Sequence, residues 1–152
     1  YGPNEYHKGS MQSVIARNFA RTSAGEALQL FRSYRSDYAD GGQLRDFIYV
    51  RDCIDVMEWL LEQPRVSGLF NVGTGQARSW LDLAGALFAA CEQPRKVQFI
   101  DMPETLQSRY QYFTEARMQR LREAGYPRPF TSLEAGVADY VSRYLSAADP
   151  YL

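Results

Sequence analysis

The sequence predicts an α/β fold of the mixed α+β kind, and three observations support this prediction. Short runs of β-branched and aromatic residues alternate with longer segments whose apolar residues recur at helical spacing. Ser, Thr or Asp residues precede several of the longer segments, and Gly or Pro residues follow them. The 152 residues contain no internal repeat and no low-complexity linker. We therefore expect a single domain over residues 1–152.

Apolar periodicity and capping residues define the elements of the first half. The stripe Met11, Val14, Ile15 and Phe19 predicts the first helix, with Ser10 as its cap. The expected order is a loop over 1–9, a helix from Ser10 to Gly25, extended segments over 27–31 and 32–38, a loop over 39–42, a strand over 47–50, and a helix that Asp52 caps and that stops before Pro64.

The same signals continue through the second half. A strand over 69–72 is expected to run into the turn Gly73-Thr74-Gly75, and Ser79 is expected to cap the next helix. Then follow a strand over 97–100, an irregular stretch over 102–112, a helix that Thr114 opens and Gly125 ends, and a last helix with a capping box formed by Thr131 and Glu134.

Composition excludes several classes of function. The net charge of −1 gives no general surface for nucleic acid or anionic membrane. No apolar run approaches the roughly 20 residues that span a bilayer, and no basic-then-apolar leader is present. The chain begins at Tyr1 without an initiator methionine, which suggests a piece of something longer. We expect a cytoplasmic protein in which Cys53 and Cys91 are buried, reduced thiols and no cluster has metal-ligand spacing.

Lys8 is the first residue that could carry chemistry. Fifteen of the 17 cationic residues are arginine, yet a lysine stands between His7 and Gly9. Lysine can accept and return a proton when desolvation or a nearby positive charge lowers its pKa, whereas arginine stays protonated. The start of the following helix would add such positive potential. A solvated loop lysine is the alternative reading.

Three further segments combine functional side chains. Arg45 precedes Asp46 at the edge of an aromatic strand and offers a fork of donors to a phosphate; an exposed Arg45–Asp46 pair of little energetic value is the alternative. The run Gly73-Thr74-Gly75 allows close approach of a ligand, or forms only a tight turn. The segment from Ser108 to Phe113 can stack a base or sugar, or provide core aromatics under a loop.

Four runs, taken in order, resemble one family. They are Tyr1-Gly2-Pro3-Asn4-Glu5-Tyr6-His7-Lys8-Gly9-Ser10-Met11, Arg45-Asp46-Phe47-Ile48-Tyr49-Val50, Phe70-Asn71-Val72-Gly73-Thr74-Gly75 and Arg109-Tyr110-Gln111. The whole chain is similar to the C-terminal half of the ADP-L-glycero-D-manno-heptose 6-epimerases, which are extended short-chain dehydrogenase/reductases. The resemblance implies a substrate-binding lobe whose Rossmann half is largely absent, in keeping with the lack of a glycine-rich dinucleotide fingerprint.

The resemblance also implies an activity. The family inverts C6 of the heptose in ADP-D-glycero-D-manno-heptose by oxidation and re-reduction, for lipopolysaccharide core biosynthesis. Its cofactor is NADP, with NAD possible, and the missing half would bind most of it. Two acid/base groups are needed. Lys8 matches one of them and would also lie near the cofactor, whereas the tyrosine of a Tyr-x-x-x-Lys motif has no counterpart here. The lobe alone is therefore expected to be inactive.

Further site residues follow from the resemblance alone. The positions that match substrate contacts are Ser10, Arg17, Phe31, Arg32, Ser33, Tyr34, Arg45 and Tyr110. Arg45 corresponds to the diphosphate-binding arginine, and residues 31–34 to a patch around the nucleotide. A few extra residues lie between Tyr34 and Arg45. Expected partners are ADP-heptose and further copies of the chain, since the family forms homo-oligomers. Two alternatives remain, another UDP- or GDP-sugar epimerase or dehydratase and a non-catalytic nucleotide-sugar-binding fragment.

Overall fold

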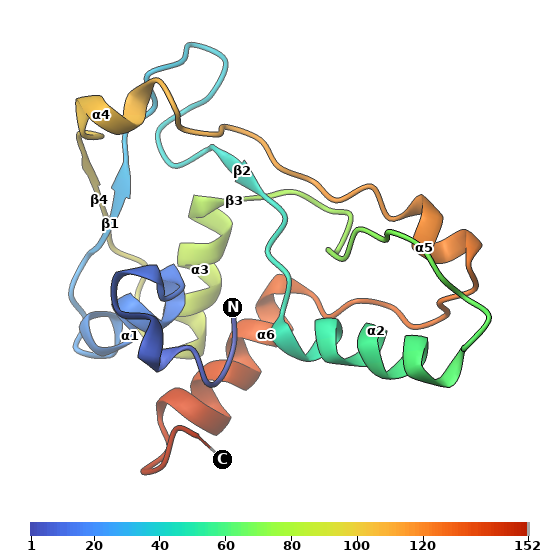
Figure 1. Ribbon diagram of the computed structural model, residues 1–152. Coiled ribbons are helices and arrows are strands. Elements are labelled where there is room, and N and C mark those ends of the chain that lie inside the picture. The colour runs from blue at the N-terminus through green and yellow to red at the C-terminus, as the bar shows by residue number, and fades with distance from the viewer. Residues whose placement is uncertain (152) are drawn as a thin grey trace.

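The computed structural model describes residues 1–151 as two short sheets with helices packed around them (Figure 1). In chain order the elements are η1 (Tyr6–Met11), α1 (Val14–Ser23), β1 (Leu28–Phe31), β2 (Leu44–Arg45), α2 (Val50–Glu62), β3 (Arg78–Ser79), α3 (Trp80–Ala90), β4 (Val97–Ile100), α4 (Glu104–Gln107), α5 (Gln119–Glu123), α6 (Leu133–Tyr140) and η2 (Val141–Leu145). Strands and helices are interleaved, so the predicted mixed α/β class is confirmed.

The main core lies where α1, α3 and α6 meet the β1–β4 sheet. Strands β1 and β4 run parallel, with Leu28 opposite Val97 and Phe31 opposite Ile100. Leu28 and Leu30 point into a cluster that includes the fully buried Ile15 and Leu87. Because α1 and α3 carry apolar faces at helical spacing, both pack on this cluster. The sheet and these helices together position the cleft described below.

A smaller core lies at the other end of the structure, where α2 runs beneath α5 (Figure 1). Its buried members are Val56, Trp59, Leu121 and Tyr126. The antiparallel pair β2–β3 lies between the two ends. The carboxylate of Asp52, near the start of α2, accepts hydrogen bonds from the backbone and side chain of Thr131, just ahead of α6. This contact joins the two helices.

Several helix starts differ from those predicted. Ser79 does cap α3, in a capping box with Asp82. The first α-helix is capped by Ser13 rather than Ser10, because the Ser13 hydroxyl accepts from Ala16 N. Ser10 belongs to the preceding 3₁₀ turn.

The other predicted caps are wrong because each of these residues forms a hydrogen bond with a residue far away in the sequence. Asp52 lies inside α2, where its carboxylate binds Thr131 instead of capping its own helix. Because the Thr131 hydroxyl donates to that carboxylate, Ser132 caps α6. Thr114 opens no helix, since its backbone N–H bonds to Leu44 O, and α5 begins only at Gln119.

Three predicted strands are also absent from the described residues. Residues 32–38 form a turn in which Ser33 N donates to Asp40, and residues 47–49 run extended into α2. Residues 69–72 have the composition of a buried strand, but Leu69 is 79% exposed. A strand requires a neighbour for its backbone hydrogen bonds, and the 1–151 region supplies none at this segment. The strands over 27–31 and 97–100 are confirmed as β1 and β4.

Cys53 and Cys91 are free, as predicted, although each is half-buried rather than fully buried. Within residues 1–151 no helix has the length and apolarity to cross a bilayer. The same residues contain no group of three or more His, Cys, Asp or Glu side chains arranged to hold a metal ion.

Candidate functional site

A cleft of about 390 Å³ opens between α1 and the β1–β4 sheet, and we call it the α1–β1 cleft. This volume is within the range of small-molecule sites. Residues from five parts of the fold line it: Val14, Arg17, Asn18, Arg21, Gln29, Leu30, Phe31, Trp80, Ile100 and Tyr110. Three of the predicted substrate contacts, Arg17, Phe31 and Tyr110, therefore come together in one cleft.

The walls of the α1–β1 cleft combine aromatic rings with polar groups. Phe31 meets Tyr110 edge-to-face at 6.3 Å between ring centroids. On the α1 side, Arg17 reaches Ser10 O at 3.5 Å and Arg21 pairs with Glu26 at 3.1 Å. Aromatic walls with a few cations suit a flat, anionic ligand such as a nucleotide.

Arg45 sits beside this cleft, over one of its aromatic walls. Its guanidinium lies 5.2 Å from the ring centroid of Tyr110 and donates one hydrogen bond to Leu44 O. No ion pair formed within residues 1–151 involves this half-buried cation. A partly desolvated guanidinium without a carboxylate partner is suited to bind an anion.

Tyr110 contributes a neutral phenol to the same wall. Burial raises the pKa of Tyr110 above its usual value, and this effect outweighs the opposite influence of the Arg45 charge. The hydroxyl therefore stays protonated at neutral pH and can donate a hydrogen bond. Its ring meanwhile offers a π face to the Arg45 guanidinium.

Asp46 does not hold Arg45, so the alternative of a simple Arg45–Asp46 pair is wrong. Its carboxylate accepts from Thr74 N at 2.8 Å, Thr74 Oγ1 at 2.5 Å, Gly75 N at 2.9 Å and Ala116 N at 3.0 Å. Three separate segments thus meet at this side chain. Gly73-Thr74-Gly75 forms a tight turn that is anchored to the end of β2, next to Arg45.

Lys8 does not line the α1–β1 cleft, beside which Arg45 lies. It is exposed and lines a small depression together with Glu5, Met11 and Ser13. The predicted contact Ser10 lies on the same exposed loop. Arg17 connects the two places, because it lines the α1–β1 cleft and also donates to Ser10 O.

The other residues of the predicted 31–34 patch lie outside the cleft lining. Arg32 pairs with Asp40 at 3.3 Å and with Asp101 at 3.4 Å. Ser33 donates to Arg35 O, and Tyr34 is 49% exposed. Only Phe31 of this group lines the cleft.

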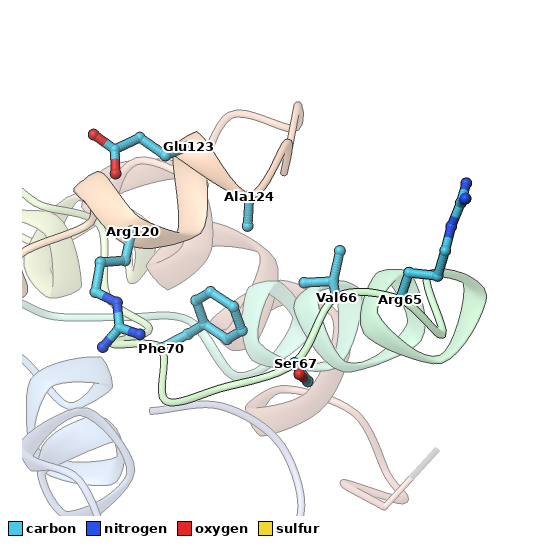
Figure 2. Close-up of a pocket in the computed structure, with 7 residues that line it drawn as sticks. All are labelled: Arg65, Val66, Ser67, Phe70, Arg120, Glu123 and Ala124. Carbon is cyan, nitrogen blue, oxygen red and sulfur yellow. The ribbon is translucent and has the colours of Figure 1, made fainter.

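A second hollow lies on the opposite part of the structure, between the end of α2 and α5 (Figure 2). Arg120 extends toward Phe70, with its guanidinium 6.0 Å from the ring centroid, and Arg65 lines the hollow on the side of α2 (Figure 2). None of the predicted site residues lines this hollow. It is open and holds no convergent set of polar groups, so it is a weaker candidate.

Sequence reasoning missed several residues of the cleft. Asn18 and Arg21 lie one and four positions beyond Arg17 on α1, so helical spacing could have indicated Arg21. Gln29 and Ile100 carry no such local signal, since they meet the cleft only through the pairing of β1 with β4. Trp80, the first residue of α3, packs on Phe47 at 5.0 Å between ring centroids.

Comparisons with known proteins identify related chains. Residues 1–73 match the NAD dependent epimerase/dehydratase family. The whole chain is 59% identical to an ADP-L-glycero-D-manno-heptose-6-epimerase of Nitratidesulfovibrio vulgaris and covers 47% of it. It is 46% identical to the enzyme of the same name from Fusobacterium nucleatum, of which it covers 48%. The chain thus spans about half the length of the curated relatives it matches.

Solved structures support the same relationship. The crystal structure of the ADP-L-glycero-D-manno-heptose-6-epimerase of Helicobacter pylori matches with a TM-score of 0.73 and 28% identity. The match covers 94% of this chain and 41% of that one. The two short sheets and their helices therefore correspond to part of a larger fold.

Proposed function

We propose that the chain is a member of the NAD dependent epimerase/dehydratase family and forms the substrate-binding part of an ADP-L-glycero-D-manno-heptose 6-epimerase, as its match over residues 1–73 and its named relatives support. The full-length protein would invert C6 of the heptose in ADP-D-glycero-D-manno-heptose, within lipopolysaccharide core biosynthesis. Identity of 46–59% over the whole chain to relatives of that name supports this choice over a UDP- or GDP-sugar enzyme.

One observation carries the binding half of the proposal. Arg45 is half-buried, has no ion pair within the described residues and stacks on Tyr110, which lines the α1–β1 cleft. The adenosine would occupy the aromatic cleft, and the diphosphate would bind the Arg45 guanidinium. Arg17 and Ser10 would face the substrate on the side nearer Lys8.

Lys8 supplies the catalytic half of the proposal. Its amine would act as one of the two acid/base groups at the C6 carbinol. The loop that carries it also contains Ser10, which Arg17 links to the α1–β1 cleft. A sugar extending from that cleft past Arg17 would therefore approach Lys8.

The nicotinamide cofactor of this family does not fit within residues 1–151. The chain lacks the glycine-rich fingerprint between a strand and a helix, and Gly73-Thr74-Gly75 is occupied by its contacts with Asp46. We assign cofactor binding mainly to residues outside this chain, with Lys8 at its edge. NADP, a cytoplasmic location and a homo-oligomeric state remain predictions.

The test is an epimerase assay on the full-length protein. With NADP added, incubation with ADP-D-glycero-D-manno-heptose should give the L-glycero epimer. Chromatography of the heptose released from the product measures its formation. Lys8→Ala should lower kcat by about 10²- to 10⁴-fold, the usual contribution of a general acid/base. Turnover of UDP- or GDP-sugars but not of the ADP-heptose would overturn the substrate. Wild-type turnover in Lys8→Ala would overturn the assignment of Lys8.

A further inference from the structure

The carboxylate of Glu5 is buried, and its partners are Ser13, the N-cap residue of α1, and Tyr140, at the end of α6. The side chain is 5% exposed. Its Oε2 accepts from Ser13 N at 2.5 Å, and its Oε1 accepts from Ser13 Oγ at 2.6 Å. A third bond, at 3.0 Å, comes from the hydroxyl of the fully buried Tyr140. A buried carboxylate with this many donors is rigidly held.

The bonds to Ser13 close a loop. Glu5 precedes the 3₁₀ turn η1, and Ser13 is the N-cap of α1, so the pair clamps the base of residues 6–12. Lys8 lies within this closed segment. The clamp uses both the backbone and the side chain of Ser13, which fixes the start of α1 as well as the loop.

Hydrogen bonds inside the loop connect the backbone of Lys8 to the Glu5–Ser13 contact. The backbone N–H of Lys8 donates to Glu5 O at 3.0 Å, and Gln12 Nε2 donates to Tyr6 O at 2.8 Å. Gly9 adopts φ 53°, a conformation that favours glycine, and the 3₁₀ segment is kinked directly after Lys8. The Lys8 backbone is therefore attached to Glu5 through both the main chain and the closed loop.

We infer that Glu5 is a positioning residue that holds Lys8 in place for proton transfer. Glu5 is assigned no contact with the reacting atoms, because its side chain is 5% exposed and both of its carboxylate oxygens are bonded to Ser13 or Tyr140, whereas Lys8 is exposed. The inference rests on the proposed function, because it gives Glu5 a role only through Lys8. A loop freed at its base would let the amine move, and small misplacements of a catalytic group strongly reduce the rate.

Glu5→Gln in the full-length protein tests the inference. Glutamine keeps the size of the side chain but cannot accept at both oxygens. We expect kcat for ADP-D-glycero-D-manno-heptose to fall about 10-fold or more. KM should stay within about twofold, because Arg45 and Tyr110 lie outside the clamped segment and only Ser10 among the proposed substrate contacts lies inside it. Tyr140→Phe is the matched control: it removes one bond from the same carboxylate and leaves the Ser13 clamp intact, so kcat should stay near wild type.

A double-mutant cycle separates positioning from general destabilisation. If Glu5 acts through Lys8, Glu5→Gln/Lys8→Ala turns over no more slowly than Lys8→Ala. Full additivity of the two effects, or wild-type kcat in Glu5→Gln, would overturn the inference. Should Glu5→Gln fail to fold, Ser13→Ala removes the hydroxyl side of the clamp and should show the same fall in kcat without a change in KM. Wild-type turnover in Lys8→Ala would instead overturn the assignment of Lys8, and a wild-type protein that does not turn over the ADP-heptose would overturn the proposed function itself.

Discussion

Asp46 lies so close to Gly73 that a Cβ added to Gly73 would come 2.5 Å from Asp46 Oδ2. The added Cβ would also collide with the Cβ of Ala116. Because Asp46 accepts hydrogen bonds from both Thr74 and Ala116, neither neighbour can withdraw without breaking them. The absence of a side chain at Gly73 is thus a condition for the turn that supports Arg45.

Gly73→Ala should therefore destabilise the protein by about 1–3 kcal/mol, the usual cost of overpacking. Thermal unfolding of the full-length protein measures the change. Gly85→Ala is the control, because Gly85 lies inside α3 and the nearest atom to an added Cβ is 3.8 Å away. Alanine favours a helix interior by about 0.5–1 kcal/mol, so that variant should be as stable as wild type or more so. Equal stability of the two variants would contradict the argument.

Arg45→Ala should weaken substrate binding more than it weakens the fold. Loss of a charge-assisted pair costs about 1.5–3 kcal/mol, which corresponds to a rise in Kd of about 10- to 150-fold. Calorimetry with the ADP-sugar measures it. Arg128→Ala serves as the control, since Arg128 forms an exposed ion pair with Asp55 and does not line the α1–β1 cleft. An unchanged Kd in Arg45→Ala would exclude the diphosphate contact.

Sequence reasoning succeeded where the signal was local. The predicted cap at Ser79 bonds to a residue only three positions away, and the predicted runs of β1 and β4 are continuous in sequence. It failed where a distant residue competes for the same group. Threonine is a common N-cap residue, but the Thr131 hydroxyl donates to Asp52, 79 positions away. Ser132 is the N-cap of α6 instead.

The candidate site shows the same limit. Residue chemistry and the resemblance both point to Arg45 and Tyr110, but neither predicts their stacking, which depends on the backbone hydrogen bonds that hold residues 112–114 beside Leu44. Residues 69–72 were expected to form a strand from composition, which reports burial but not the presence of a pairing neighbour. Glu5 carries no local sign of its role, because its partner Tyr140 lies 135 positions away.

Stability should depend on pH through Glu134. The hydrogen bond from Arg78 holds the pKa of Glu134 below its usual 4.5. A carboxyl whose pKa is lowered on folding stabilises the protein above its unfolded pKa and loses that contribution as pH falls through the folded value. The effect is small, because the side chain is 56% exposed and solvent screens the pair.

Glu134→Gln should therefore lower Tm slightly at neutral pH and have no effect in acid below the folded pKa. Melting curves across the acidic range, with wild type alongside, measure the difference. Glu58→Gln is the control: Glu58 is exposed on α2 and forms no ion pair within the described residues, so its curve should parallel wild type. A Glu134→Gln effect that persisted unchanged in acid would rule out the charge as its cause.

The contact between Asp52 and Thr131 gives a last prediction, about the joint between α2 and α6. Asp52 is 5% exposed, and its carboxylate accepts from Thr131 N at 3.0 Å and from Thr131 Oγ1 at 2.7 Å. Thr131→Val keeps the shape of the side chain but removes one donor to a buried charge, which costs about 1–3 kcal/mol. Thr131→Ser retains the hydroxyl and should unfold in urea close to wild type. If Thr131→Ser loses stability and Thr131→Val does not, the methyl group rather than the hydrogen bond holds the joint.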